Sequence, residues 1–206
     1  MNTILPIEQI ESLFDKPIRL EQMGMDRFED IFARDRDGVL KMTFAIWSRH
    51  VRRNPSTNPD AVGDHVHKHG GTFLDGASAV IGEPIIKDIE FSRCKIDDPA
   101  LDNQFVAYLL VARVFPNDLH IADLNLVNPY KLIPPKLRKH KLRKFKGLGL
   151  AGTVLARAEA FAVSKQCDYV TLTAAADDLV PLFGKFGFVL EDDEVASLAM
   201  EKKVGR

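Results

Sequence analysis

The chain has 206 residues, of which 46% are hydrophobic and 28% are charged, a composition typical of one globular domain with a sizeable core. Its formal net charge is −1, but residues 131–146 contain eight Lys and Arg and no acid, so 20 basic and 29 acidic residues give the rest of the chain a net charge of −9. No segment approaches the roughly eighteen consecutive apolar residues of a membrane-spanning helix, and the N-terminal segment lacks the basic and apolar regions of a signal peptide.

The cysteine pattern indicates an intracellular protein. Cys94 and Cys167 do not have the close spacing of metal ligands. We therefore expect two reduced thiols in a cytoplasmic protein without a membrane partner. Because Cys167 comes just before an apolar run, we expect its side chain to be buried.

Hydrophobic periodicity predicts helices and strands in the N-terminal half, residues 1–115. Leu40, Phe44 and Trp47, for example, recur at helical spacing. The nearly continuous apolar run at 105–115 is typical of a central strand covered on both faces. The expected elements are a helix at 7–15, a strand at 17–23, two helices within 26–53 separated by DRDG at 35–38, a long loop at 54–71, and strands at 85–95 and 105–115.

The second half, residues 119–204, alternates strands with helices. The expected elements are a strand at 119–127 that ends at Asn128 and Pro129, a helix at 148–165, a strand at 168–175, a short helix at 177–186, and closing strands at 187–190 and 197–204. This order predicts an α/β or α+β layered fold with a mixed sheet, in a single domain that spans 1–206.

The most distinctive local sequence, KFKGLGLAG at 144–152, joins the basic stretch to an expected helix. Glycines let backbone N–H groups converge, and a helix N-terminus adds partial positive charge. The turn therefore suits a bound phosphate or pyrophosphate. Gly152 would also let the helix pack closely on the sheet.

Three interpretations of this turn compete. The letters GLGLAG match a dinucleotide-binding fingerprint, but positions 171–173 carry no acid and too few residues follow for a doubly wound sheet. A Walker A loop requires a Lys-Ser or Lys-Thr pair, which does not follow these glycines. The third interpretation is a glycine turn that only packs a helix.

The turn and its surroundings resemble the GNAT superfamily of acyl-CoA-dependent N-acyltransferases. The family's Q/R-x-x-G-x-G/A signature is similar to KFKGLG at 144–149, with Lys at the Q/R position, and its L-Y-x-K-x-G-F element is similar to LFGKFGF at 182–188. The strand end VNP at 127–129 is similar to the family's V-x-P. The resemblance covers 119–204 in detail and 17–115 by order of elements. It implies a GNAT-like, mostly antiparallel central sheet flanked by helices.

The resemblance also implies acetyl-CoA or another acyl-CoA as co-substrate. The backbone of Leu126 and Val127 would pair with the pantetheine arm as an added strand, and the turn would hold the pyrophosphate with help from neighbouring cations. The residues assigned to the cofactor in this way are Leu126, Val127, Arg143, Lys144, Phe145, Lys146, Gly147, Leu148, Gly149, Leu150, Ala151 and Gly152. Lys185 is either a further phosphate ligand or a plain surface lysine.

The sequence departs from the family in three places. Residues 130–143 lengthen the connection before the turn. Phe183 stands where many members have the tyrosine that protonates the leaving thiolate, and Ala176 stands where the family often has an asparagine. The cofactor-binding half is thus better preserved than the proton-transfer half, which keeps a non-catalytic acyl-CoA-binding protein as an alternative.

Deprotonation of an amine requires a general base, which many family members place as a glutamate on the strand before the turn. Asp123 is the first choice for this role and His120 the second. The alternatives are a water relay and an Asp123 that is only solvated or capping. Tyr130 and Tyr169 are weaker candidates for a proton donor, because such aromatics are more often packed in a core or rim.

Two further features leave alternatives open. His65, His67 and His69 alternate, so an extended segment would place all three imidazoles on one face, toward a metal or an acceptor. A polar loop with incidental histidines is the more common case, and no metal site is assigned. The basic stretch 131–146 has few aromatics for base stacking, so a nucleic-acid partner is a lesser alternative to the attraction of CoA.

The sequence therefore predicts a cytoplasmic N-acetyltransferase, monomeric or homodimeric, that transfers an acyl group from acyl-CoA to an amine of a small molecule or a protein. A nucleic-acid-associated protein anchored by 131–146 is the alternative from a different class.

Overall fold

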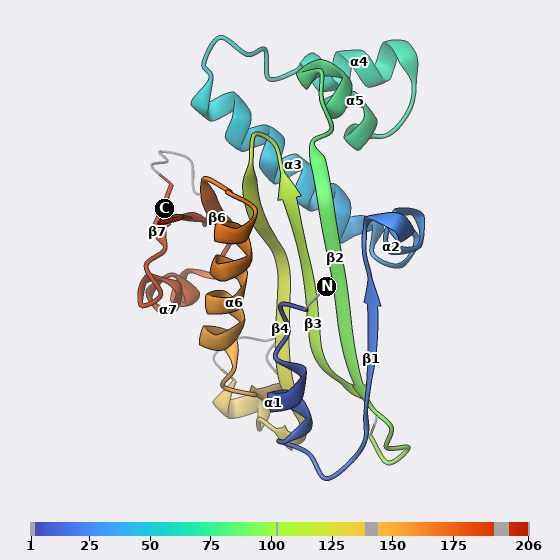
Figure 1. Ribbon diagram of the computed structural model, residues 1–206, viewed down its shortest axis with the longest axis vertical. Helices are drawn as coiled ribbons and strands as arrows, with labels where there is room; N and C mark the ends of the chain where they lie inside the picture. Colours follow the sequence, from blue (N-terminus) through green and yellow to red (C-terminus); the bar gives the residue numbers. More distant parts are fainter. Residues whose placement is uncertain (1–2, 102, 139–143, 192–197, 206) are drawn as a thin grey trace.

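The computed structural model describes residues 3–101, 103–138, 144–191 and 198–205. In this part of the chain eight strands form one sheet in the order β1-β2-β3-β4-β6-β8-β7, with β5 attached to β4 off this path (Figure 1). β4 and β6 run parallel, and the other paired strands run antiparallel. The strands are β1 Ile18–Met23, β2 Ile86–Ile96, β3 Phe105–Val114, β4 Asp118–Leu132, β5 Phe145–Gly147, β6 Tyr169–Thr173, β7 Val189–Leu190 and β8 Ala199–Lys203.

Helices cover both faces of this sheet, so the predicted layered fold with a mixed, mostly antiparallel sheet is confirmed. Helices α1 and α6 pack on one face, and α2 to α5 contribute to the apolar core on the other, with α3 crossing behind the sheet in Figure 1. The helices are α1 Ile7–Glu11, α2 Phe28–Arg34, α3 Arg36–Arg53, α4 Ala61–His69, α5 Phe73–Ile81, α6 Ala151–Ser164 and α7 Val180–Gly184. Short 3-10 turns are η1 Met25–Arg27, η2 Pro135–Leu137 and η3 Asp177–Leu179.

The apolar run at 105–115 serves both cores, as predicted for a central strand. Leu109 and Val111 belong to the core beneath α1 and α6, whereas Leu110 and Ala112 belong to the core beneath α3. All four are at most 1% exposed. Each fully buried Leu of this kind stabilises the fold by about 2 kcal/mol relative to exposure. Alternation along β3 therefore fixes the two helical layers to one sheet.

The sequence DRDG separates α2 from α3, as predicted. Asp35 ends the first helix and its Oδ1 accepts a hydrogen bond from the Gly38 N–H at 3.0 Å, which caps the second. The residues buried on α3 are not all those whose spacing suggested the helix, because Phe44 is 60% exposed. The buried stripe consists of Val39, Met42, Thr43, Ile46 and Trp47.

The predicted loop at 54–71 is wrong in its second half, because residues 61–69 form α4. The sequence analysis also missed α5. Thr72 and Asp75 begin α5 with a capping box, in which each side chain accepts a hydrogen bond from the other residue's N–H. Gly76 lets the two helices approach closely, since a Cβ there would lie 2.7 Å from Val66 Cγ2. The helix α4 depends on this contact with α5. Its own polar, glycine-rich sequence gives no local sign of the helix.

The helical conformation of α4 also changes the histidine pattern. His65 and His69 lie one turn apart, with ring centroids 4.6 Å apart, and His67 is turned away from that face. The expectation of three imidazoles on one extended face is therefore wrong. Among the described residues no group of three or more His, Cys, Asp or Glu is arranged to hold a metal ion. The helices in the same part of the chain include none that is long and apolar enough to cross a membrane.

β4 continues past Asn128 and Pro129 to Leu132, so the predicted strand end is wrong. The cause is β5, which pairs with this extension through Val127–Gly147, Asn128–Lys146 and Leu132–Phe145. Proline cannot donate a hydrogen bond, and the register shift between 128 and 132 accommodates it. The basic stretch therefore starts on a two-stranded ribbon that extends the sheet beside the glycine turn.

A pair of glycine substitutions tests the packing of α4 on α5. We expect Gly76→Ala to lower the free energy of unfolding by about 1 kcal/mol, because its methyl group would overlap Val66. Gly63→Ala, in the middle of α4 with nothing within 4 Å, should raise it by about 0.5–1 kcal/mol through helix propensity. Urea unfolding measures both. Equal effects of the two substitutions would contradict this packing.

Candidate functional site

The glycine turn lies between β5 and the N-terminus of α6, at the lower end of that helix in Figure 1. The Leu148 N–H donates to the Leu126 carbonyl at 3.2 Å, which holds the turn against β4. Gly149 then adopts a φ of +78°, and α6 begins at Ala151. The first amides of a helix have no partner within it. Together these features direct unpaired N–H groups and the positive end of the α6 dipole to one place.

The two later glycines of the turn have different roles. A Cβ on Gly149 would project into open space, so the turn leaves room for a bound group. A Cβ on Gly152 would lie 2.9 Å from the Phe186 ring. The prediction that Gly152 brings the helix close to the sheet is therefore wrong. The absence of a side chain here instead lets α6 approach Phe186, in the segment after α7.

The remaining residues assigned to the cofactor fall into three groups. Lys144, Lys146 and Gly147 are exposed. Phe145, Leu148, Leu150 and Ala151 are half-buried, and the two leucines pack against the core beneath α6. Arg143 lies outside the described residues. Lys185, on the turn after α7, is exposed as well. Lys144 directly precedes β5 and Lys146 lies within it, so both are next to the turn.

The edge of β4 that faces this turn is only partly paired. Leu119 to Ile121 pair with β6, and Val127 to Leu132 pair with β5. Leu126 and Val127 are therefore already bonded to the chain itself, and the expectation that they form an open edge is wrong. Within the described part of the chain, residues 122–125 have no partner on this edge, and this open stretch starts at a β-bulge at Ala122 where the register with β3 shifts. Because β5 pairs with β4 from Val127 onward, the open part of this edge lies at 122–125 and not at 126–127.

Asp123 lies on this open stretch, on the α3 side of the sheet. Its side chain is exposed, yet the surrounding protein partly desolvates the carboxyl and raises its pKa, and the nearby negative charge of Asp35 raises it further. The Leu124 N–H and Lys41 act in the opposite direction. A carboxylate with a raised pKa that still reaches solvent is a suitable general base.

Two residues that the sequence analysis missed lie next to Asp123. The Tyr108 hydroxyl donates a short hydrogen bond to Asp35, the cap of α3, and it senses the charge of Asp123. Burial is the main cause that raises the pKa of Tyr108, followed by its bond to Asp35. Tyr108 is an isolated polar group in an apolar run and Asp35 is a helix-capping residue, so only their proximity across the α2–α3 junction reveals the cluster.

His120 is placed differently from Asp123. It is 6% exposed, and its Nδ1 lies 2.9 Å from the Thr171 hydroxyl of β6. Burial, aided by the Arg49 charge, lowers its pKa to about 4, so the ring is neutral at pH 7 and a weak base. Of the two predicted bases, Asp123 is thus the one that solvent can reach.

The aromatic candidates for a proton donor are all engaged elsewhere. Tyr130 donates its hydroxyl hydrogen to Asp98 at 2.7 Å, and Tyr169 lies under the guanidinium of Arg53. Phe183 packs edge-on against Phe188, with ring centroids 6.2 Å apart, and belongs to the rim of the core beneath α6.

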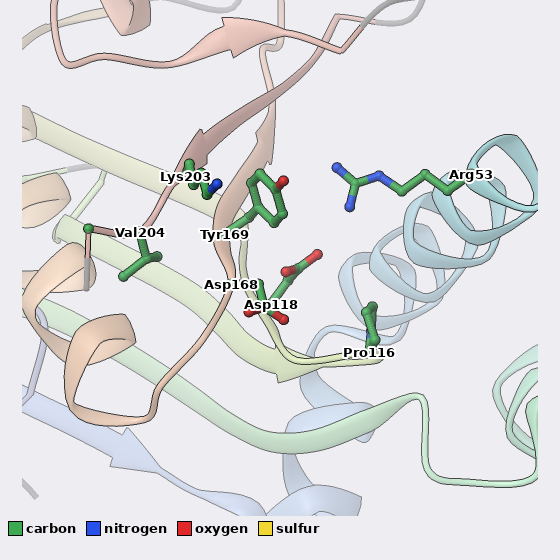
Figure 2. A pocket seen from close by; sticks show the side chains of 8 residues that line it. Arg53, Pro116, Asp118, Asp168, Tyr169, Lys203 and Val204 are labelled. Atoms are coloured by element: carbon green, nitrogen blue, oxygen red, sulfur yellow. The ribbon is translucent and has the colours of Figure 1, made fainter.

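A separate cavity of about 750 Å³ lies at the start of β4 and β6, where Asp118 and Tyr169 face the end of α3 (Figure 2). From Asp118 to Leu126, beside the glycine turn, the strand rises by roughly 25 Å. The cavity therefore lies at the start of β4, well separated from the glycine turn near the middle of the strand.

Comparison with known proteins yields distant likenesses. No family model and no curated protein matches the chain. Among solved structures, nourseothricin acetyltransferase is 17% identical with a TM-score of 0.36, over 57% of this chain and 66% of that one, just under two thirds of its length. PaiA N-acetyltransferase from Thermoplasma acidophilum, in complex with coenzyme A, is 13% identical with a TM-score of 0.36, over 91% and 99% of the two chains. An acyl-CoA N-acyltransferase from Pseudomonas aeruginosa is 15% identical with a TM-score of 0.39, over 90% and 99%. At these scores the likenesses assign neither fold nor activity, which rest on the geometry of this chain.

The buried neutral His120 predicts a specific pH dependence of stability. Its pKa is about 4 in the folded chain and about 6.5 when unfolded, so only the unfolded state takes up this proton as the pH falls from 6.5 to 4. The protein should therefore lose about 3 kcal/mol of stability over this range relative to His120→Gln. Urea unfolding of both proteins at pH 7 and pH 4 measures the difference. A constant difference between the two proteins would show that the folded chain accepts the proton.

Proposed function

We propose that this protein transfers an acetyl or other acyl group from acyl-CoA to an amine acceptor, as a single acyltransferase domain over 1–206. The observation that carries the proposal is the arrangement at the end of β4. A glycine turn with unpaired helix amides adjoins an open strand edge that leads to an accessible carboxylate. Both apolar cores share the one sheet, which supports a single domain.

The residues at the turn fit the phosphates of an acyl-CoA. Gly149 leaves open space where a side chain would otherwise stand, and the amides that begin α6 are available as donors. Lys144 and Lys146 are exposed beside them and add positive charge. A pyrophosphate placed here would be partly neutralised by these two lysines.

The pantetheine arm is assigned to the open edge at 122–125 instead of the predicted 126–127. An extended amide chain can pair with an unpaired strand edge by backbone hydrogen bonds. This edge ends at the bulge beside β6, so the reacting end of the arm would reach the neighbourhood of Asp123. The corrected position brings donor and base together on one strand.

The acyl-CoA would supply a thioester carbonyl for attack by the amine. Asp123 would accept the proton from the ammonium group. Desolvation raises the pKa of Asp123 and so makes it a stronger base for this proton transfer. Asp35 would add negative charge that attracts a cationic acceptor, while Tyr108 holds Asp35 in place. Backbone N–H groups along the open edge are the available donors to the carbonyl oxygen.

Phe183 is a specific reason to retain a second candidate function, an acyl-CoA-binding protein without turnover. Its ring has no proton to donate and is packed against Phe188. Release of free CoA in the presence of a panel of primary amines separates the two functions. Binding of acetyl-CoA without any release across the panel would favour the second.

The cytoplasm is the proposed location, and the thiols support it. Cys94 and Cys167 are both free and buried, as expected from the sequence, and burial raises their pKa values. Such thiols are unreactive and are typical of proteins in a reducing compartment.

Gly149→Glu should abolish binding of acetyl-CoA, because the new side chain would put negative charge and bulk where the phosphates are expected. Gly82→Glu is the matched control, since Gly82 also has a positive φ, of +84°, and open space around it, but caps α5. Isothermal titration with acetyl-CoA measures both. Retained affinity in Gly149→Glu would remove the proposed phosphate site.

Asp123→Asn should lower kcat at least on the order of a hundredfold and leave the affinity for acetyl-CoA unchanged. In the unsubstituted enzyme kcat/KM should fall at acidic pH with an apparent pKa above the ordinary value of an aspartate, because the pKa of Asp123 is raised. Asp88→Asn is the control, since both carboxylates accept from the next residue's N–H on a strand. Loss of acetyl-CoA binding in Asp123→Asn would indicate a structural role instead.

A further inference from the structure

The cavity at the start of β4 and β6 contains charges of both signs. Figure 2 shows Arg53 entering from α3, Tyr169 between Arg53 and Lys203, and the carboxylates of Asp118 and Asp168 below the ring. Pro116 and Val204 add apolar surface. The volume of about 750 Å³ lies within the range of small-molecule sites.

Asp118 is the group that this part of the fold leaves least satisfied. It is 1% exposed, and among the described residues neither of its carboxylate oxygens has a partner at good hydrogen-bonding geometry. Its contacts are Arg49 Nε at 3.4 Å and the nearby Tyr169 N–H. Leaving a buried carboxylate short of donors is unfavourable. A ligand N–H group in the cavity would supply the missing donors.

Arg49 does not satisfy Asp118 by itself because other acids share its guanidinium. Arg49 also forms ion pairs with Glu191 of the segment after β7 and with Glu201 of β8, the latter at 2.5 Å. Burial raises the pKa of Asp118 to about 6, in spite of the opposing charges of Arg49 and Arg53. The carboxylate is therefore charged at pH 7 while it lacks a dedicated cation.

The cavity also contains two cationic side chains, one on either side of the Tyr169 ring (Figure 2). The guanidinium of Arg53 lies 4.8 Å from the centre of the Tyr169 ring and pairs with Glu201, and the Lys203 side chain is exposed at the rim. A simple cation would meet repulsion from these two groups, and a simple anion would meet Asp118 and Asp168. A ligand that carries both charges matches both the acidic and the basic groups.

We propose that this cavity is a second ligand site that binds a small zwitterion of the α-amino acid class. Its ammonium group pairs with Asp118, and its carboxylate faces Arg53 and Lys203. The cavity lies at the start of β4, away from the glycine turn that is proposed to hold the phosphates.

Calorimetric titration with each of the twenty common L-amino acids at pH 7.5 tests the proposal. At least one should bind saturably. The matching amine without the carboxylate and the matching acid without the amine should each bind at least about tenfold more weakly, as expected from loss of one charged contact. Absence of saturable binding, or equal binding of either analogue, would overturn the proposal.

Substitutions then locate the site. Asp118→Asn should weaken binding of the best amino acid at least about tenfold. Lys203→Met changes an exposed side chain and should fold normally. It should weaken binding of the amino acid and leave binding of the amine analogue unaffected. Lys185→Met, beside the glycine turn, should change the affinity for neither. Unchanged amino-acid affinity in both cavity variants would place the binding elsewhere. Affinity for acetyl-CoA should stay constant in both, which keeps this outcome separate from the proposed function.

The pH dependence provides a further readout. The charged and titratable groups that face Asp118 are Arg49 and Arg53 from α3, Asp168 and Tyr169 at β6, the buried Cys167 thiol before β6, whose pKa is raised, and the neutral His120 of β4. Affinity should rise between pH 5 and pH 7 as Asp118 ionises, and the rise should be missing in Asp118→Asn. A pH profile that persists in the variant would contradict the role of this carboxylate.

Discussion

Strand β4 is the constraint on which the rest of the structure depends. β3 pairs along one edge of it, and β6 and β5 share the other. β6 pairs with only three residues before the strands separate, and β5 returns only from Leu126 onward. The stretch left between them, 122–125, is therefore the place where an extended ligand can add to the sheet, and the bulge at Ala122 marks its start. The proposed donor path follows directly from this pairing.

A buried ion cluster connects the two halves of the chain around the first residues of the same strand. Arg49 of α3 meets Asp118 of β4 and two acids from the closing strand pair, Glu191 and Glu201. Removing one partner from such a buried cluster is costly, because the remaining charges stay desolvated. The cluster therefore holds α3 against β4 and β8, and it leaves Asp118 with too few donors beside an open cavity. One cluster thus explains both a structural connection and a candidate ligand site.

The order of elements was largely predictable because it depends on local patterns. The alternation of Leu109, Leu110, Val111 and Ala112 between two cores is what a continuous apolar strand requires, and DRDG caps a helix through Asp35 as such a sequence commonly does. Helix α4 was not predictable in this way. It is polar, contains a glycine and forms against α5 through a contact at Gly76, so its stability comes from a neighbour that the local sequence does not reveal.

The position of the glycine turn and its charge could be predicted from local sequence, because glycines, a following helix and flanking lysines are local properties. The sequence also predicted Asp123 as the candidate general base. Tertiary structure alone decided which edge of β4 stays open, because that depends on where β5 returns to the strand. It likewise decided that His120 is buried and neutral while Asp123 reaches solvent next to Asp35 and Tyr108. Desolvation and proximity between distant segments set these properties, and neither is encoded in the spacing of residues along the chain.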